Sequence, residues 1–363
     1  MTSPARIIEL RDADAGLEAF VVIDHELFPI SAGGTRMLPD VSVEEVARLA
    51  RAMTWKFSAC RVRYAGAKAG VRFATGDRDA VMTAYLRALE PLKDVFLTGP
   101  DMGTRPSDFV AQAGGDDLPL WALDYEGLGM DDLATGHGVA AAAEAGLRHL
   151  GVSLQDGVVA IEGFGKVGAG TARACARARA RVIAVSTVHG LIADPDGLDV
   201  EELIRLRALH GDRLVEHAGV RVRPREELFD LECDVVVPGA RPDSVTVGVA
   251  ERLRCRVVAP GANVPYGEGA VEALHARGIL AIPDFVSNSG GVHLYESVRQ
   301  DDEPAAALAR IGGLVDAAVT RVLVAAEESG STPMGAAMAE ARAFLEEETD
   351  APPERLNELF GTA

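Results

Sequence analysis

Hydrophobic positions in the first 130 residues alternate between strand-like runs and helical spacing. This pattern predicts, in chain order, a strand over 19–24, a helix from Ser42 to about Phe57, a helix over 79–92 and a strand over 95–98. Ser42 followed three residues later by Glu45 predicts a capping box at the start of the first helix. This part of the chain is therefore expected to mix helices and strands.

After residue 136 the pattern becomes more regular. Residues 137–150 predict a long Ala-rich helix, and short β-branched runs then alternate with helical segments. The runs lie at 158–161, 182–185, 235–237, 257–259 and 279–282, with helices expected up to about 178 and over 200–208. Such alternation predicts a parallel, doubly wound sheet over about 151–285 with helices on both faces, followed by a helical tail over about 303–347.

Length, composition and charge narrow the class of protein. A chain of 363 residues suggests two domains, and 48% hydrophobic with 25% charged residues is typical of globular proteins rather than disordered or collagen-like chains. The formal net charge of −19 disfavours a nucleic acid or an anionic membrane surface as partner.

The four cysteines lie far apart in sequence, without the spacing of a disulfide framework or a zinc site, so no metal site is expected. The first eleven residues have no apolar stretch typical of a signal peptide, and no long apolar run predicts a spanning helix. We therefore expect a cytoplasmic protein.

A glycine motif, G-x-G-x-x-G, follows the predicted strand 158–161 and precedes a helix. It comprises Gly163, Phe164, Gly165, Lys166, Val167 and Gly168. In this context the glycines allow a tight turn, close approach of a pyrophosphate and close packing of helix and strand. The motif predicts a site for NAD or NADP.

The end of the next predicted strand bears on the choice of coenzyme. Ser186 and Thr187 stand where an acid would bind the ribose 2′-hydroxyl of NAD, and no Arg or Lys follows directly to bind a 2′-phosphate. Lys166 and Arg181 are nearby in sequence. The sequence therefore leaves the choice between NAD and NADP open, with a slight preference for NAD.

Two lysines and an acid precede this motif. Lys56 and Lys68 lie among apolar or small residues, where an ammonium group needs an anionic partner, and Asp101 follows the predicted strand 95–98. Taken singly, each of the three also fits an ordinary surface or salt-bridge residue.

Together with further short motifs, these residues resemble the glutamate/leucine/phenylalanine/valine dehydrogenase family. The motifs occur in family order from about residue 17 to residue 296: Gly33-Gly34-Thr35-Arg36, Lys56, Lys68, Asp101, Thr135-Gly136-His137-Gly138, the glycine motif, Gly261-Ala262-Asn263 and Asn288-Ser289-Gly290-Gly291. The length is closer to the leucine and phenylalanine members.

The resemblance implies a substrate-binding and catalytic α/β domain over 1–130, a Rossmann-type dinucleotide-binding domain over 131–290 and a C-terminal helical segment, 291–363, that returns to the first domain. It also implies NAD(P)-dependent oxidative deamination of an L-amino acid to a 2-oxo acid and ammonia, the reverse reductive amination, and a homo-oligomer.

The resemblance also implies roles for individual residues. Lys56 would pair with the substrate carboxylate, Lys68 would activate a water molecule, and Asp101 would move protons to and from the amino group. Gly33, Gly34, Met53, Asn288 and Tyr295 would bind the substrate. Thr135, Ser186, Thr187, Ala240, Asn263 and Asn288 would join the glycine motif in binding the coenzyme. The asparagines and glycines among them also fit plain turns.

Two positions depart from the family pattern. Glutamate-specific members resemble each other in a Lys directly before the Gly-Gly pair, where this chain has Ala32. A buried γ-carboxylate without a cation is costly, so an apolar or mid-sized substrate side chain is expected instead of glutamate. Tyr295 occupies a position that is usually small in the family.

Two alternatives remain open. In the first, the chain is a catalytically weakened relative with a regulatory or assembly role. In the second, it is a dehydrogenase of 2-hydroxy acids. The second needs a His-carboxylate pair, for which only His137 and His293 lie near a motif.

Overall fold

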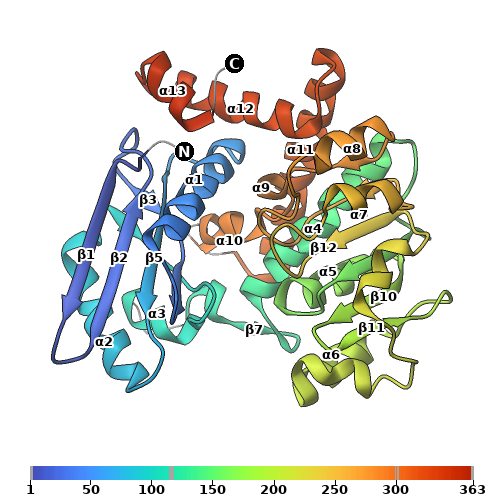
Figure 1. Ribbon diagram of the computed structural model, residues 1–363, viewed down its shortest axis with the longest axis horizontal. Coiled ribbons are helices and arrows are strands. Elements are labelled where there is room, and N and C mark those ends of the chain that lie inside the picture. Colours follow the sequence, from blue (N-terminus) through green and yellow to red (C-terminus); the bar gives the residue numbers. More distant parts are fainter. Residues whose placement is uncertain (1–2, 114–117, 299, 301, 361–363) are drawn as a thin grey trace. The chain divides into compact units, whose positions relative to one another are not determined.

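The computed structural model describes residues 3–113, 118–298, 300 and 302–360. These residues form two compact units: unit 1 comprises 1–122 and 338–363, and unit 2 comprises 123–337. Each is described below by itself (Figure 1). Parts of the predicted ranges 1–130 and 291–363 lie outside the described residues.

Unit 1 contains a six-stranded mixed sheet. Its strands are β1 (Arg6–Asp12), β2 (Leu17–Ile23), β3 (Ser31–Ala32), β4 (Thr35–Leu38), β5 (Ala65–Arg72) and β6 (Phe96–Leu97). Their order is β1-β2-β5-β3-β6, and β4 pairs with β5. The pairs β1/β2 and β2/β5 are antiparallel, while β3, β4 and β6 join by parallel pairing. Strand β5 is thus central, and its residues 65–71 are buried.

The helices of unit 1 pack on this sheet and on each other. They are α1 (Val43–Ala59), α2 (Arg78–Leu89), α3 (Pro106–Ala113) and α13 (Pro353–Phe360), with 3₁₀ turns η1 (Glu90–Leu92) and η2 (Leu120–Ala122). Val46 and Ala50 of α1 pack on Phe20 and Val22 of β2. Helix α1 packs tightly on β5 at Gly66, because a Cβ atom there would lie 2.3 Å from the backbone of α1.

The start of α1 bears out half of the predicted capping box. The Ser42 hydroxyl accepts a hydrogen bond from the Glu45 amide at 3.1 Å, as an N-cap should. The Glu45 carboxylate, however, accepts from Arg36 at 2.6 Å. An ion pair with a neighbouring strand therefore takes the place of the reciprocal bond that a capping box would make.

A buried ion pair fixes α1 and the C-terminal helix within unit 1. The Arg51 Nε lies 2.9 and 2.8 Å from the two carboxylate oxygens of Asp24, and Thr54 donates to the same carboxylate at 2.6 Å. Arg51 also donates to the carbonyl oxygen of Glu358 in α13 at 2.8 Å. The exposed fractions of Asp24 and Arg51 are only 2% and 7%.

Replacing Arg51 by methionine is expected to lower the free energy of unfolding by about 3–5 kcal/mol, because the Asp24 carboxylate stays buried without its cation. Urea unfolding followed by circular dichroism measures the change. Arg48→Met, which removes an exposed arginine of the same helix, should change it by less than about 0.5 kcal/mol. Equal losses in the two variants would contradict the assignment.

Unit 2 contains a doubly wound sheet in the order β11-β10-β9-β12-β13-β14. The strands are β9 (Val158–Glu162), β10 (Arg181–Thr187), β11 (Gly190–Ala193), β12 (Val235–Pro238), β13 (Val257–Val258) and β14 (Leu280–Ala281). Strands β9, β10 and β12–β14 pair in parallel, whereas β11 is an antiparallel edge strand that sequence patterning missed. A separate two-stranded sheet comprises β7 (Asp124–Tyr125) and β8 (Leu128–Gly129). The predicted α/β fold class is confirmed.

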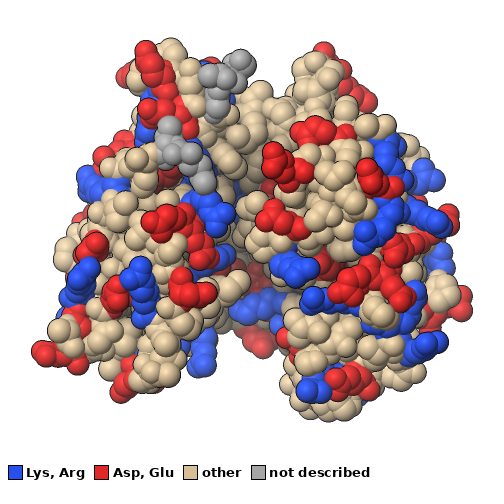
Figure 2. Space-filling model, in the orientation of Figure 1, with Lys and Arg blue, Asp and Glu red and all other residues tan. Residues whose placement is uncertain are grey.

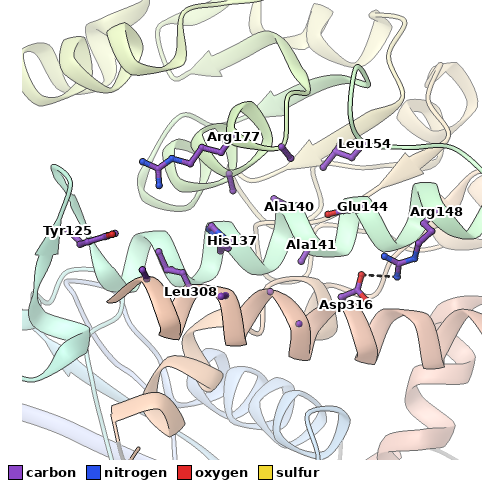
Figure 3. Close-up of a pocket in the computed structure, with 16 residues that line it drawn as sticks. Tyr125, His137, Ala140, Ala141, Glu144, Arg148, Leu154, Arg177, Leu308 and Asp316 are labelled. Atoms are coloured by element: carbon purple, nitrogen blue, oxygen red, sulfur yellow. Dashed lines mark ion pairs between the residues drawn. The ribbon is translucent and has the colours of Figure 1, made fainter. Parts of the chain in front are cut away.

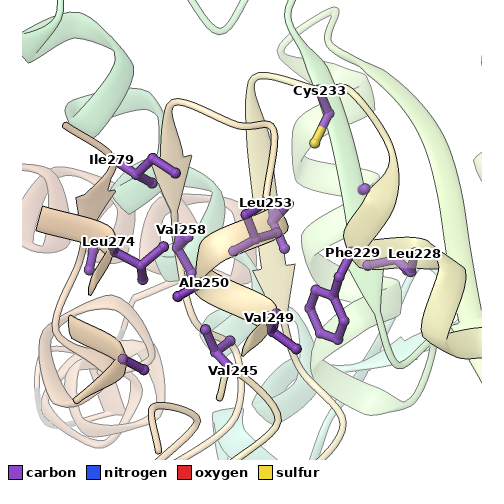
Figure 4. Packing of buried hydrophobic residues seen from close by; sticks show 14 of the residues in the cluster. Leu228, Phe229, Cys233, Val245, Val249, Ala250, Leu253, Val258, Leu274 and Ile279 are labelled. Carbon is purple, nitrogen blue, oxygen red and sulfur yellow. The ribbon is translucent and has the colours of Figure 1, made fainter. Parts of the chain in front are cut away.

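Helices surround the sheet of unit 2. They are α4 (Met130–His149), α5 (Lys166–Arg177), α6 (Val200–His210), α7 (Val247–Arg252), α8 (Ala270–Ala276), α9 (Asp284–Ser287), α10 (Gly290–Val298) and α11 (Pro304–Ser329), with η3 (Gly211–Glu216) and η4 (Arg225–Asp230). Helix α12 (Pro333–Glu348) begins in this unit, and most of its residues belong to unit 1. One core cluster joins α7, α8 and η4 to the sheet through residues such as Leu228, Val249 and Leu274 (Figure 4).

The unit boundary lies within α12, so the tail is shared between the units. Helix α11 and residues 291–337 belong to unit 2, because α11 and α10 pack on α4, and only residues from 338 onward belong to unit 1. This division differs from the predicted boundary at 290. Compact units do not by themselves assign roles, so the functional roles of the predicted ranges remain predictions.

Acidic and basic side chains are interspersed on the face of the molecule that Figure 2 shows. Among the described residues, no helix combines the length and the apolar character needed to cross a membrane.

Candidate functional site

In unit 1, Lys68 and Asp101 form a close, largely buried ion pair. Lys68 lies on β5 between Ala67 and Ala69 and is 8% exposed. Its Nζ atom is 2.6 Å from Oδ2 of Asp101, which follows β6. The predicted pair is therefore assembled within one unit, from a central strand and a loop.

Arg36 completes this group, although sequence reasoning gave it no role. Its Nε atom lies 3.0 Å from the same Asp101 oxygen, and its Nη1 atom lies 2.6 Å from Oε1 of Glu45. The pairing of β4 with β5 brings Arg36 alongside Gly70. Two cations and two acids thus alternate as Lys68, Asp101, Arg36 and Glu45.

The charges around Asp101 set its protonation state. Burial alone would raise the pKa of the Asp101 carboxyl, but the Lys68 ammonium and the Arg36 guanidinium outweigh burial and hold that pKa well below its usual range. Asp101 is therefore ionised at neutral pH. Uptake of a proton by Asp101 is disfavoured while both cations are in place.

The two glycines before Arg36 lie against this group for different reasons. A Cβ atom at Gly33 would stand 1.7 Å from the Ala67 carbonyl oxygen, so glycine is required there for packing. At Gly34 it would stand 3.0 Å from the Asp101 Cβ and 3.3 Å from the Lys68 Nζ. Gly34 therefore borders the ion pair directly, whereas Gly33 supports the neighbouring strand.

Lys56 and Met53 lie one turn apart in the C-terminal half of α1, both half-buried. This helix packs on β5, the strand that carries Lys68. The structure thus places the two predicted lysines on adjacent elements of unit 1. Their predicted roles toward a substrate remain predictions.

In unit 2, the glycine motif forms the turn between β9 and α5. Gly163 has φ +92°, and a Cβ atom there would lie 3.1 Å from the Ala240 backbone. A Cβ atom at Gly168 would lie 1.9 Å from the Gly163 carbonyl oxygen. A Cβ atom at Gly165 would have no protein atom within 4 Å. Two glycines therefore hold the turn together, and the third faces open space.

This turn fits a dinucleotide. Helix α5 begins without a side-chain cap at Gly165, so its first amide groups are available to an anion. Lys166, whose side chain is 57% exposed, lies 3.8 Å from Asp132 Oδ1. Phe164 is buried and Val167 contacts the Gly261 loop, so these two residues would offer only their backbone. A pyrophosphate group is the ligand that this backbone arrangement suits.

The end of β10 supports the turn. The Ser186 hydroxyl accepts a hydrogen bond from the Gly163 amide at 3.2 Å, and the Ser186 carbonyl accepts from the Phe164 amide at 2.8 Å. Ser186 and Thr187 are both buried. Arg181 begins β10, at the opposite end of the strand, and donates to the Pro195 carbonyl. Its sequence proximity to the motif therefore does not place it beside the turn.

Three further candidates gather in unit 2. Asn288 donates from Nδ2 to the Ala262 carbonyl at 2.9 Å and to Asn263 Oδ1 at 3.1 Å, while its own Oδ1 is buried without a hydrogen-bond partner. Thr135 lies against Gly290 and Gly291, which follow Asn288 closely in sequence. The structure therefore brings Asn263, Asn288 and Thr135 near one another, and their roles toward a ligand remain predictions.

Tyr295 lies on α10, one turn beyond Gly291, and is 37% exposed. The carboxylate of Asp131 on α4 lies near both Tyr295 and Gly291. It acts electrostatically on the Tyr295 hydroxyl, and its Oδ1 atom would lie 3.7 Å from a Cβ atom added at Gly291. Sequence reasoning gave Asp131 no role.

The cavity shown in Figure 3 lies elsewhere in unit 2. It measures about 580 Å³ and lies between α4, α5 and α11, with His137, Arg177 and Asp316 among its lining residues. None of the predicted site residues lines it. Burial lowers the pKa of His137, and within the described residues the only charge that acts on its imidazole is the Arg177 guanidinium, not a carboxylate. The cavity gives no support to a 2-hydroxy acid dehydrogenase.

Comparison with known proteins gives consistent results. The family description "Glutamate/Leucine/Phenylalanine/Valine dehydrogenase" matches residues 127–347, and "Glu/Leu/Phe/Val dehydrogenase, dimerisation domain" matches residues 4–113. The glutamate dehydrogenase of Thermotoga maritima is 32% identical over 290 residues, which cover 72% of this chain and 67% of that protein. The relatives include NADP-specific and NAD-specific glutamate dehydrogenases.

Solved structures of amino acid dehydrogenases share the fold of this chain. The hetero-hexameric glutamate dehydrogenase from Thermus thermophilus, in its leucine-bound form, has a TM-score of 0.82 and 27% identity, covering 95% of this chain and 89% of that one. L-tryptophan dehydrogenase from Nostoc punctiforme shares the fold, with a TM-score of 0.69, 22% identity and coverage of 95% and 96%. The chain belongs to the glutamate/leucine/phenylalanine/valine dehydrogenase family of NAD(P)-dependent amino acid dehydrogenases.

Proposed function

We propose that this chain catalyses oxidative deamination of an L-amino acid with an apolar or mid-sized side chain, and the reverse reductive amination, with NAD as the preferred coenzyme. The buried pair of Lys68 and Asp101, 2.6 Å apart beside Gly34, is the observation that carries the proposal. A lysine held on a rigid strand by an ionised acid is positioned for proton transfer to and from a substrate.

Each residue of this group has a proposed part in the reaction. Lys56 binds the substrate α-carboxylate. Lys68, once its ammonium group has released a proton to solvent, accepts a proton from the water molecule that attacks the iminium carbon. Asp101, which is ionised, attracts the substrate ammonium group and takes up a proton once that group displaces Lys68 or Arg36. A nicotinamide bound at the glycine turn would supply the acceptor for the hydride that leaves Cα. Overall, amino acid, oxidised coenzyme and water give 2-oxo acid, ammonium, reduced coenzyme and a proton.

The charge balance in unit 1 supports a substrate other than glutamate. Lys68 and Arg36 are already matched by Asp101 and Glu45, so this group has no spare positive charge for a second substrate carboxylate. Ala32, at the end of β3, adds none. The relatives named glutamate dehydrogenase make this preference a point to be tested directly.

Replacing Ala32 by lysine is expected to raise kcat/KM for 2-oxoglutarate relative to 4-methyl-2-oxopentanoate by roughly 10- to 100-fold, because a cation would then face the second carboxylate. A panel of 2-oxo acids with ammonium, followed by the absorbance of NADH or NADPH, measures the ratio.

Ala74→Lys is the matched control, since it adds the same charge to an exposed loop of unit 1 and should leave the ratio unchanged. No gain in the Ala32 variant would remove the basis for the proposed preference. Coenzyme binding without turnover on the whole panel would favour a catalytically weakened relative instead.

The preference for NAD rests on the surroundings of β10. Lys166 is paired with Asp132, and Arg181 lies at the far end of the strand, so neither is placed to bind a 2′-phosphate. Titration with both coenzymes tests this point. We further propose a homo-oligomer in the cytoplasm, a proposal that the matched dimerisation domain supports.

A further inference from the structure

The acidic side chain directly before the glycine turn is half-buried, and one of its carboxylate oxygens is shielded at a cost that the fold does not explain. Glu162 is the last residue of β9 and precedes Gly163. Its Oε2 atom is shielded from solvent and forms no hydrogen bond of normal geometry, and the nearby Ser244 hydroxyl is likewise shielded and forms none. Buried polar atoms without partners cost free energy, so both atoms call for a reason.

The sheet topology shows where this carboxyl group lies. Ile161 faces α5, because its side chain is 3.5 Å from a Cβ placed on Gly168. Alternation along the strand therefore turns Glu162 to the opposite face, beside β12, where the Gly239 amide donates to the Glu162 carbonyl at 2.8 Å.

The strand order reverses at this point, since β10 flanks β9 on one side and β12 on the other. In doubly wound sheets, ligands bind outside the carboxyl ends of the strands at such a reversal. Glu162 thus lies at the entrance to the dinucleotide site that the glycine turn defines.

The surroundings of Glu162 favour its neutral form. Burial raises the pKa of its carboxyl group, and the Ser244 hydroxyl, the Ala240 amide and the cations of Arg241 and Arg225 oppose this effect only in part. These are the polar and charged groups acting on Glu162 from the loop after β12 and from η4, within the described residues.

We propose that Glu162 couples dinucleotide binding to the uptake of a proton. This inference rests on the proposed coenzyme site. A pyrophosphate group on the turn would bring negative charge close to a carboxyl group that is only partly exposed to water, so the bound state favours protonated Glu162. By linkage, coenzyme affinity is highest at low pH and falls as pH rises from the free-chain pKa of Glu162 to its pKa in the complex.

Coenzyme dissociation constants measured on the whole chain test this coupling. We expect the Kd of NADH, followed by its fluorescence, to rise on the order of tenfold between about pH 5 and pH 8. Glu162→Gln should lose this rise and bind more tightly than the wild type at the upper end. Asp132, whose pKa is also raised by burial, remains in both chains, so their difference isolates Glu162.

Glu251→Gln is the matched control, because it removes an exposed acid from α7 of the same unit and should keep the wild-type profile. Calorimetry of the wild type in two buffers of different ionisation enthalpy gives an independent measure: coenzyme binding should take up part of a proton within this pH range.

Identical profiles for Glu162→Gln and the wild type would overturn the inference, as would the same change in Glu251→Gln. If Glu162→Gln fails to fold, the calorimetry of the wild type decides by itself. No proton uptake on coenzyme binding across this pH range would then overturn the inference. Failure of both NADH and NADPH to bind would instead contradict the proposed function.

Discussion

Lys68→Ala is expected to reduce kcat by about 10²- to 10⁴-fold, the range that a positioned proton-transfer group contributes. The fold should survive this change, because Asp101 keeps the Arg36 guanidinium 3.0 Å away and is not left as an unpaired buried charge. Coenzyme affinity should also survive, since the glycine turn belongs to unit 2. Steady-state kinetics combined with a Kd for NADH separates the two properties.

Lys93→Ala provides the control, because it removes an exposed lysine of the same unit whose partner is Glu90. It should leave kcat unchanged. Should the alanine variant of Lys68 be unstable, Lys68→Met keeps most of the side-chain volume and allows the same comparison. A Lys68 variant that folds and retains most of its turnover would show that this residue has no part in the chemistry.

The sheet of unit 2 and the glycine turn could be predicted because their signals are local. Valine-rich runs mark β9, β10 and β12, and three glycines at fixed spacing mark the turn that follows β9. Each signal depends on neighbouring residues only. The predicted strands therefore agree with the observed ones to within a few residues.

The partners of Asp101 could not be predicted in the same way. Arg36 reaches Asp101 across 65 positions of sequence, because the residues directly before them, Thr35 and Pro100, pair in parallel. Glu45 shows how such a contact overrides a local rule, since its carboxylate binds Arg36 instead of closing the capping box. Long-range pairing decides both cases, and short sequence patterns do not encode it.

Helix α4 shows a second limit of local patterns. It begins at Met130, seven residues before the predicted start, and it continues through Gly136 and Gly138. A Cβ atom at Gly136 would stand 2.4 Å from the backbone of Gly170 in α5, and one at Gly138 would stand 3.3 Å from the Gly290 amide nitrogen. These glycines allow close packing of helices, a requirement that appears only in three dimensions.

The glycines of the turn have different roles: Gly163 and Gly168 pack against protein backbone, whereas Gly165 faces open space. Gly165→Val should weaken coenzyme binding by roughly 100-fold or more, because the new side chain would occupy the space in which a pyrophosphate meets the first amides of α5. Gly165 has φ −82°, and a Cβ atom there meets no protein atom within 4 Å, so the variant should fold normally. Fluorescence titration with NADH measures the loss, and thermal unfolding checks the fold.

Two comparisons make this result specific. Gly313→Val adds the same side chain to α11 of unit 2, where no protein atom lies within 4 Å of the new Cβ, and should leave the Kd unchanged. Gly168→Ala should instead destabilise the unit, because its Cβ would stand 1.9 Å from the Gly163 carbonyl oxygen. Normal NADH affinity in a folded Gly165 variant would mean that the dinucleotide does not cross this turn, and the coenzyme site would then have to be sought elsewhere in the chain.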